Sequence, residues 1–276
     1  MIGFELRKLL ASRRPLHAAL ALGVFLGLML AGFYTYAKNK RGDVEFRYTF
    51  ENESYFNGMT FTIYAFYFAF LLVLPIFVAT EGAVQLAGES DRGTLGLLLA
   101  RPVSKARILL AKLGVTLLYG LGLVLGLLTT CLLVGLVVVG WGDLDLYPGV
   151  LQMTDRYQHL PQAVALQRFG LVGLAAGLGL VAPISFAFLV SAWVRRPVNA
   201  AATSVALYLV LHVISGVHLF ESLRPLLFTS YLSYWRGLFQ EQIPWGDLAR
   251  DAARLGAHSC LFLGLAMHRF RTREEH

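Results

Sequence analysis

One polar stretch lies between two long apolar runs, residues 89–112, and it reads ESDRGTLGLLLARPVSKARILLAK. Its two acidic residues, Glu89 and Asp91, are outnumbered by five basic ones, and leucines recur within it at helical spacing. Pro102 breaks the helical pattern, because a proline has no backbone N–H to donate, and Ser104 can cap the helix that follows. The pattern is typical of a short polar hinge that a second protein can contact. We call residues 89–112 the hinge stretch.

The common signatures of catalysis and cofactor binding are absent from the sequence. It contains no GxxxxGK[ST] phosphate loop, no HExxH, no CxxC and no nucleophile elbow. Gly177-Leu178-Gly179 followed by Ala182 mimics a dinucleotide fingerprint, but the glycines lie inside an apolar run with no strand before them. His212 and His218 are six residues apart and do not share a helical face. We therefore expect no catalytic, cofactor-binding or metal-binding residues in this chain.

The composition indicates a membrane protein. Of 276 residues, 57% are hydrophobic and 15% are charged, whereas soluble domains carry about 25% charged residues. Both cysteines, Cys131 and Cys260, fall in apolar runs and are expected to be small core residues. The net charge of +7 reflects an excess of Lys and Arg on one side of the membrane, so we expect no nucleic-acid partner. Away from the ends of the apolar runs there are no carboxylates to drive ion-coupled transport.

Apolar runs of sufficient length predict an all-α membrane protein with six transmembrane helices. The sixth run is weak, since it includes Arg250, Asp251 and Arg254, and a charge at mid-membrane costs about 3 kcal/mol. We include it because it places the basic C-terminal segment on the same side as the hinge stretch. The predicted spans are 16–37, 59–80, 106–140, 167–194, 198–220 and 248–268, in a single transmembrane domain covering 1–276.

The segments between the spans are expected to alternate between the two sides. Residues 1–14 have the pattern of an amphipathic helix lying at the membrane surface, with Ile2, Leu6, Leu9 and Leu10 on one face and Glu5, Lys8 and Ser12 on another. The excess of Lys and Arg places both termini and residues 81–105 on the cytoplasmic side of the membrane. Residues 38–58, 141–166 and 221–246 are then outside.

The segment between the fifth and sixth spans is too short to cross the membrane. Its apolar part, LLFTSYLSYW, has ten residues and is bracketed by Pro225 and Pro244. Irregular backbone at membrane depth must be buried in protein or line a cavity, so short re-entrant helices are predicted here. The residues expected to form a gate are Pro225, Leu226, Tyr231, Tyr234 and Trp235.

The hinge stretch resembles the signature of the permease subunits of ABC-type-2 exporters. The matching parts are Ala87-Gly88-Glu89, Arg92-Gly93-Thr94-Leu95, the leucines 97–99, Arg101-Pro102-Val103-Ser104-Lys105, and Lys112. Lys105 stands where arginine is common, and the charge is kept. Asn57-Gly58-Met59-Thr60-Phe61 is similar to the branch that holds bacitracin-resistance, sodium-export and nitrous-oxide-reductase-maturation permeases.

The resemblance implies a permease of a bacterial or archaeal inner membrane that is driven by a separate ATPase. Two copies, expected to form a homodimer in the lipid membrane, would each dock on one ATPase subunit, and ATP and Mg would bind to that partner rather than to this chain. Leu95, Leu98 and Leu99 are assigned to the membrane bundle, while Arg92, Leu97 and Arg101 are left for the ATPase. The full set of expected coupling residues is Glu89, Arg92, Gly93, Thr94, Leu95, Leu97, Leu98, Arg101, Pro102, Ser104 and Lys105.

A second interpretation stays open. The chain could be a membrane assembly or maturation factor that acts on an external protein partner and translocates no small substrate. The sequence does not identify the substrate in either case.

Overall fold

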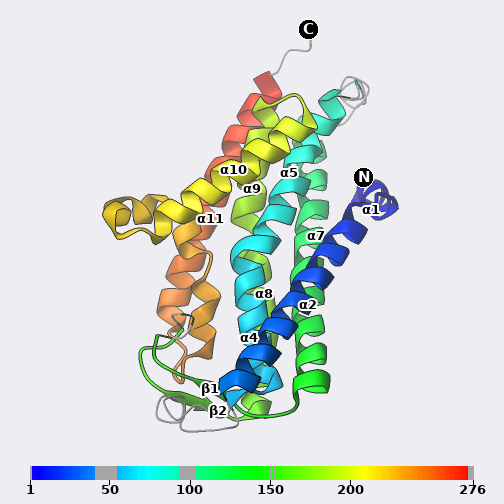
Figure 1. Cartoon of the computed structure of the whole chain (residues 1–276). Coiled ribbons are helices and arrows are strands. Elements are labelled where there is room, and N and C mark those ends of the chain that lie inside the picture. The colour runs from blue at the N-terminus through cyan, green and yellow to red at the C-terminus, as the bar shows by residue number, and fades with distance from the viewer. Residues whose placement is uncertain are drawn as a thin grey trace.

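The computed structural model of the chain describes residues 2–40, 55–91, 93, 104–149, 151 and 153–272. Long helices run side by side in one bundle, as Figure 1 shows. Both ends of the described chain lie toward one end of the bundle, and a small hairpin, β1 (Leu144–Leu146) and β2 (Gln158–Leu160), lies at the other. We call these the hinge end and the hairpin end.

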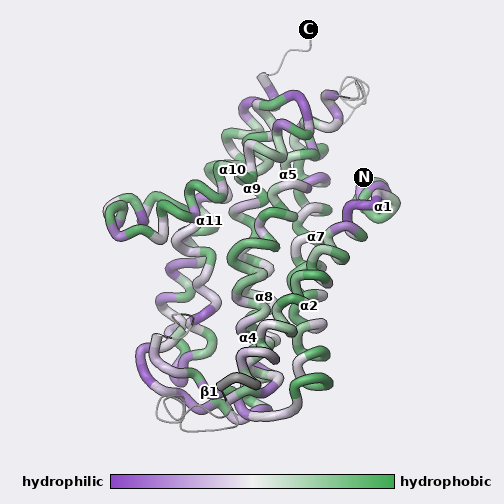
Figure 2. Tube along the Cα trace, in the orientation of Figure 1, coloured by the Kyte–Doolittle hydropathy of each residue, from purple (hydrophilic) through white to green (hydrophobic). Residues whose placement is uncertain are grey.

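The predicted all-α membrane fold is confirmed. In the part of the chain that the structure describes, five helical segments are long and apolar enough to cross a membrane: Arg14–Ala37, Gly58–Glu89, Lys105–Val139, Gln162–Trp193 and Pro197–Gly216. Figure 2 shows the apolar residues along them. The segments are built from α2 (Arg14–Lys40), α4 (Gly58–Phe68), η2 (Ala69–Val73), α5 (Leu74–Asp91), α7 (Lys105–Val134), η3 (Gly135–Val139), α8 (Gln162–Gly179), α9 (Val181–Trp193) and α10 (Pro197–Gly216).

The second of these segments is longer than its apolar run. The prediction ended the span at residue 80, but helix continues from Gly58 to Asp91 through a π-helical turn, η2, that ends just before Pro75. Asn57 caps its start, because its side-chain oxygen accepts hydrogen bonds from the backbone N–H groups of Met59 and Thr60. Residues 81–91 of the predicted polar region are therefore an extension of the span.

The sixth predicted span is a helix of a different character. α11 (Trp245–Thr272) is a single helix of 28 residues that packs along α9, and it is not among the five apolar segments because its first turns are charged. Before it come three short 3-10 helices, η5 (His218–Leu226), η6 (Phe228–Tyr231) and η7 (Tyr234–Phe239). No continuous helix connects α10 to α11.

The hairpin at the opposite end was not predicted. β1 and β2 pair antiparallel, with Asp145 opposite His159 and Leu144 opposite Leu160. Both leucines are buried against the bundle, while His159 is exposed. In β1 all three residues are buried, Asp145 included, whereas in β2 only Leu160 is buried. Three residues per strand are too few for a sequence pattern to reveal.

The core lies between the second span and the helices that surround it. Around η2 it is aromatic, with Phe66 and Phe70 packed on the indole of Trp235. Toward the hinge end it changes to small residues, where Ala79, Ala83 and Ala87 of α5 meet Ala187 of α9 and Ala200 of α10. Small side chains let helix backbones approach closely, so α5, α9 and α10 pack closely here.

Candidate functional site

Four of the predicted coupling residues lie within the described part of the hinge stretch. Glu89 ends the buried face of α5, Gly93 is exposed with a φ of +66°, and Ser104 and Lys105 begin α7. The predicted capping by Ser104 is confirmed, since its Oγ accepts a hydrogen bond from the N–H of Arg107. Lys105 donates to the backbone carbonyl of Arg271 near the end of α11, 3.2 Å away. The other coupling residues, Arg92, Thr94, Leu95, Leu97, Leu98, Arg101 and Pro102, lie outside the described residues.

A buried lysine connects the two flanks of the hinge stretch. Lys112 of α7 is only 1% exposed, and its Nζ lies 3.0 Å from a carboxylate oxygen of Glu89 on α5. The same Nζ lies 3.0 Å from a carboxylate oxygen of Glu5, which belongs to the N-terminal helix α1 (Ile2–Ala11). Lys8 of α1 forms a second ion pair with Glu89. One cluster of charges thus ties α1, the end of α5 and the start of α7 together.

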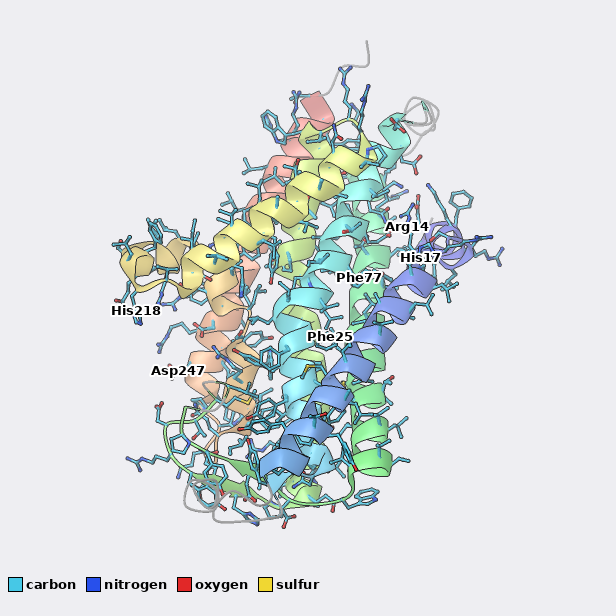
Figure 3. The ribbon with its side chains drawn as sticks, viewed as in Figure 1. Arg14, His17, Phe25, Phe77, His218 and Asp247 are labelled. Carbon is cyan, nitrogen blue, oxygen red and sulfur yellow. The ribbon has the colours of Figure 1, made fainter. Side chains whose placement is uncertain are left out.

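A further ion pair fixes the start of α2 to α5. Arg14 donates hydrogen bonds of 2.9 Å to both carboxylate oxygens of Glu81, which is 2% exposed. Gln85 of α5 donates to the same carboxylate at 2.7 Å. Figure 3 labels Arg14 where α2 begins, next to α1. We call Glu5, Lys8, Arg14, Glu81, Glu89 and Lys112 the charge cluster.

The charge cluster sets the orientation of the N-terminal helix. The prediction placed Ile2, Leu6, Leu9 and Leu10 on one membrane-facing side of α1 and Glu5 on the polar side. In the structure Leu9 packs with Val115 and Tyr119 of α7, while Ile2 and Leu10 are exposed. Glu5 turns inward to Lys112 and is buried. The predicted face is therefore divided, because the inward ion pair rotates Leu9 into the bundle.

The end of α5 is also fastened to α9. The hydroxyl of Ser191 accepts hydrogen bonds from the N–H groups of Leu86 and Ala87, at 3.1 and 2.9 Å, and donates to the carbonyl of Ala83. At Gly82 an added Cβ would lie 3.0 Å from the Cβ of Ala187, which is tighter than ordinary packing allows. The last turns of α5 are thus held on two sides, by the charge cluster and by α9.

This arrangement can transmit a displacement of the hinge stretch. Burying charges costs several kcal/mol per ion unless each one is paired, so the members of the cluster stabilise one another only in this geometry. Separating α1, α5 or α7 would leave a buried charge without its partner. The three helices are therefore expected to move together when the hinge stretch is displaced.

The predicted gate residues do not form one cluster. Trp235 is fully buried against Phe66 and Phe70. Tyr234 donates to the carbonyl of Ala175 on α8 at 2.7 Å. Pro225 and Leu226 are exposed at the end of η5, and the hydroxyl of Tyr231 links back to the carbonyl of Pro225. The segment is anchored at η7 and exposed at η5.

Sequence reasoning missed most of the charge cluster. Lys112 was noted as part of the motif but not assigned a role, and Glu5, Lys8, Arg14 and Glu81 were not selected at all. A usable signal was present: Glu81, Gln85 and Glu89 follow one another at a spacing of four and so share a face of one helix. Lys112 stands alone at the start of an apolar run, where a charge needs a partner.

The site offers ion pairs rather than ligands for a cofactor. Within the described residues, no group of three His, Cys, Asp or Glu side chains is arranged to hold a metal ion. The carboxylates of the charge cluster are each matched by a cation of the same cluster.

Comparison with known proteins identifies the family. No curated protein matches the chain. A family model described as ABC-2 family transporter protein matches residues 3–241, which include α1, the hinge stretch and the three short helices before α11. The match covers well over half of the 276 residues. The chain therefore belongs to the ABC-2 transporter family and is a multi-pass membrane subunit of a transporter rather than an enzyme.

Proposed function

We propose that this chain is the permease of an ATP-driven exporter and that its hinge stretch receives the motion of a cytoplasmic ATPase. Permeases of this family work with an ATP-binding partner. Two permease copies and two ATPase subunits would form the complete transporter in the cytoplasmic membrane, with both termini on the ATPase side. ATP and Mg would be held by the ATPase.

The observation that carries the proposal is the buried pairing of Lys112 with Glu5 and Glu89. It joins the helix that enters the hinge stretch to the helix that leaves it, and it adds the N-terminal helix to both. A force on residues 92–103 would then act on α1, α5 and α7 together. A solvated turn with no mechanical role would not need a lysine that is 1% exposed.

The three short helices before α11 are the part of the chain that can move when the hinge stretch is displaced. η7 is held by Trp235 and Tyr234, whereas η5 is exposed along most of its length. Segments with few buried contacts open at lower free energy than the core around them. We assign the gate to this segment, with Pro225 and Leu226 at its exposed end and Tyr231, Tyr234 and Trp235 at its anchored end.

A pair of glycines with similar left-handed backbone conformations offers a matched test of the hinge stretch. Gly93 and Gly149 both have positive φ, +66° and +77°, and at neither position would an added Cβ meet any atom within 4 Å. Gly93→Leu and Gly149→Leu should therefore impose similar local strain. They differ in position, because Gly149 follows β1 at the hairpin end.

The measurement is co-purification of the ATPase with each variant, together with ATP turnover in proteoliposomes. We expect Gly93→Leu to lose the ATPase or its coupled turnover, and Gly149→Leu to keep both. Equal behaviour of the two variants would reject the assignment of coupling to the hinge stretch. The purified chain without its partner should hydrolyse no ATP. Turnover by such a preparation would reject the assignment of ATP hydrolysis to the partner.

A further inference from the structure

The first half of α11 carries charges at the depth of the apolar helices. Arg254 places its guanidinium over the ring of Tyr231 in η6, 5.1 Å from the ring centre. Thr229 of η6 donates to the carbonyl of Leu211, inside α10. In the next layer Phe228 packs against both Tyr208 of α10 and Phe262 of α11.

Tyr208, which Phe228 contacts, reaches the middle of the second span. The hydroxyl of Tyr208 donates to the carbonyl of Leu71 in η2, which lies midway along the helical segment Gly58–Asp91. Arg254 is therefore beside the middle of the bundle and not at its end. Figure 2 shows the polar first half of α11 running next to apolar helices.

These charges are exposed on the surface of a single copy. The side chains of Asp247, Arg250 and Arg254 are 67%, 63% and 48% exposed. Asp247 pairs with Arg250 at 3.1 Å and Asp251 with Arg254 at 3.2 Å, so the face is neutral but polar. Figure 3 shows Asp247 on the side of the bundle away from Arg14 and His17. Charges at mid-membrane cost about 3 kcal/mol each against lipid, so lipid is a poor cover for this face.

Next to the charges α11 presents a row of exposed residues, all of them small except Arg250. Six exposed positions alternate in spacing between four and three, as the contact line of two parallel helices does: Gly246, Arg250, Ala253, Ala257, Cys260 and Gly264. An added Cβ at any of its glycines would meet no atom within 4 Å. Small residues at this spacing allow two helix backbones to approach closely. We call these six residues the α11 seam.

We propose that the α11 seam is the contact between two copies of this chain, with the α11 helices parallel about a two-fold axis along the bundle. This inference rests on the proposed function, which requires two permeases, and it adds where they meet. The charges are complementary in that arrangement. Arg250 of each copy lies on the seam beside an Asp247, so the layer holds two positive and two negative charges.

The other exposed helices can contact lipid directly. α2 and α10 are also mostly exposed in a single copy, but their outward side chains are apolar, such as Leu20, Val24 and Val210. Lipid covers such residues without cost. Compared with α2 and α10, the charged face of α11 is where a second copy removes a penalty, because it replaces hydrocarbon by opposite charges.

Cysteine cross-linking tests the seam with a control on the same helix. In a Cys260→Ser background, Ala257→Cys places a thiol on the seam, and Ala252→Cys places one on an exposed position of α11 outside it. Mild oxidation in membranes should link two copies through position 257 and leave position 252 uncross-linked. If the two variants cross-link equally, or only position 252 does, the proposal is wrong.

The environment of position 257 separates the alternatives. If Ala257→Cys does not cross-link but reacts rapidly with a water-soluble maleimide, the face lines water. If it neither cross-links nor reacts, lipid or another protein covers it. Either result overturns the proposal. Arg250→Asp should lower the cross-linked fraction, and Asp247→Arg combined with Arg250→Asp should restore it.

These readouts are independent of the ATPase. A chain that retains its ATPase but does not cross-link at position 257 would refute only the seam. A chain that cross-links there but recruits no ATPase would refute only the proposed function.

Discussion

The two ends of the bundle are held together by different kinds of interaction. At the hinge end four segments meet through paired charges, with Lys112 buried between Glu5 and Glu89. At the hairpin end two spans cross by close backbone contact, where Gly58 donates its N–H to the carbonyl of Gly140 at 2.8 Å and lies against Gly135. Asn57 adds a bond from its side-chain amide to the carbonyl of Asp143.

The difference matches what each end is proposed to do. Ion pairs are directional and hold several helices in one relative geometry, which suits a region that passes on a displacement. A glycine crossing is a steric contact that closes the bundle and leaves the loops beyond it to fold separately. The comparison predicts that charge changes act at one end and volume changes at the other.

The largest effect is expected from Lys112→Met. The change leaves the buried carboxylates of Glu5 and Glu89 without their shared cation, which should cost about 3–5 kcal/mol of folding free energy. Lys105→Met is the matched control, since Lys105 is partly exposed and donates to one backbone carbonyl. That control should cost less than about 1 kcal/mol. Denaturant unfolding in detergent measures both.

If lost ion pairs cause the effect of Lys112→Met, a second substitution should partly reverse it. Adding Glu5→Gln should recover part of the loss, because one fewer carboxylate is then unpaired. If Lys112→Met and Lys105→Met are equally mild, the charge cluster does not hold the hinge end together.

A smaller effect is expected from Gly135→Ala at the hairpin end. The new Cβ would lie 2.5 Å from the carbonyl oxygen of Gly58, so the backbone of one span must shift. Overpacking of this kind costs about 1–3 kcal/mol. Gly126→Ala, in the same span with no atom within 4 Å of its added Cβ, should be neutral or slightly stabilising. Thermal unfolding of the two variants compares them, and equal stability would show that the crossing is loose.

The smallest predicted effect is a pH dependence of the stability of the hairpin. The hydrogen bond from His159 to Asp145, 2.8 Å long, and the nearby charges of Asp145 and Asp143 raise the pKa of His159 above 6.5. Tyr157 also donates to Asp145. A raised pKa in the folded state means that protonated His159 stabilises the hairpin below pH 6.5, and that this stabilisation is lost as the pH rises through the folded pKa.

The measurement is thermal stability as a function of pH in detergent. Between pH 6 and pH 8 the wild type should lose slightly more stability than His159→Gln, because the variant lacks the imidazole that titrates. The effect is small because His159 is nearly half exposed, where water and salt weaken ion pairs. Identical pH profiles would show that the pairing with Asp145 contributes nothing.

The sequence by itself determined the class of the protein and the positions of its main helices. Apolar runs long enough to cross a membrane are a local property, so five spanning segments follow from composition alone. Helix ends are local too, and Ser104 begins α7 as the pattern of a polar cap before a helical run predicts. The bracketing prolines correctly indicated that no continuous helix joins α10 to α11.

Only the tertiary structure decided which charges are partners. Glu5 and Lys112 are more than a hundred residues apart, and no local periodicity relates them. The same holds for Ser191, whose hydroxyl reaches the backbone of α5, and for the hairpin, whose strands are too short to show alternation. The sequence showed that the charges of α11 would be costly inside a membrane. The fold decided that they face outward at mid-bundle. Burial and pairing between distant segments depend on how the helices pack, and packing is a property of the whole chain.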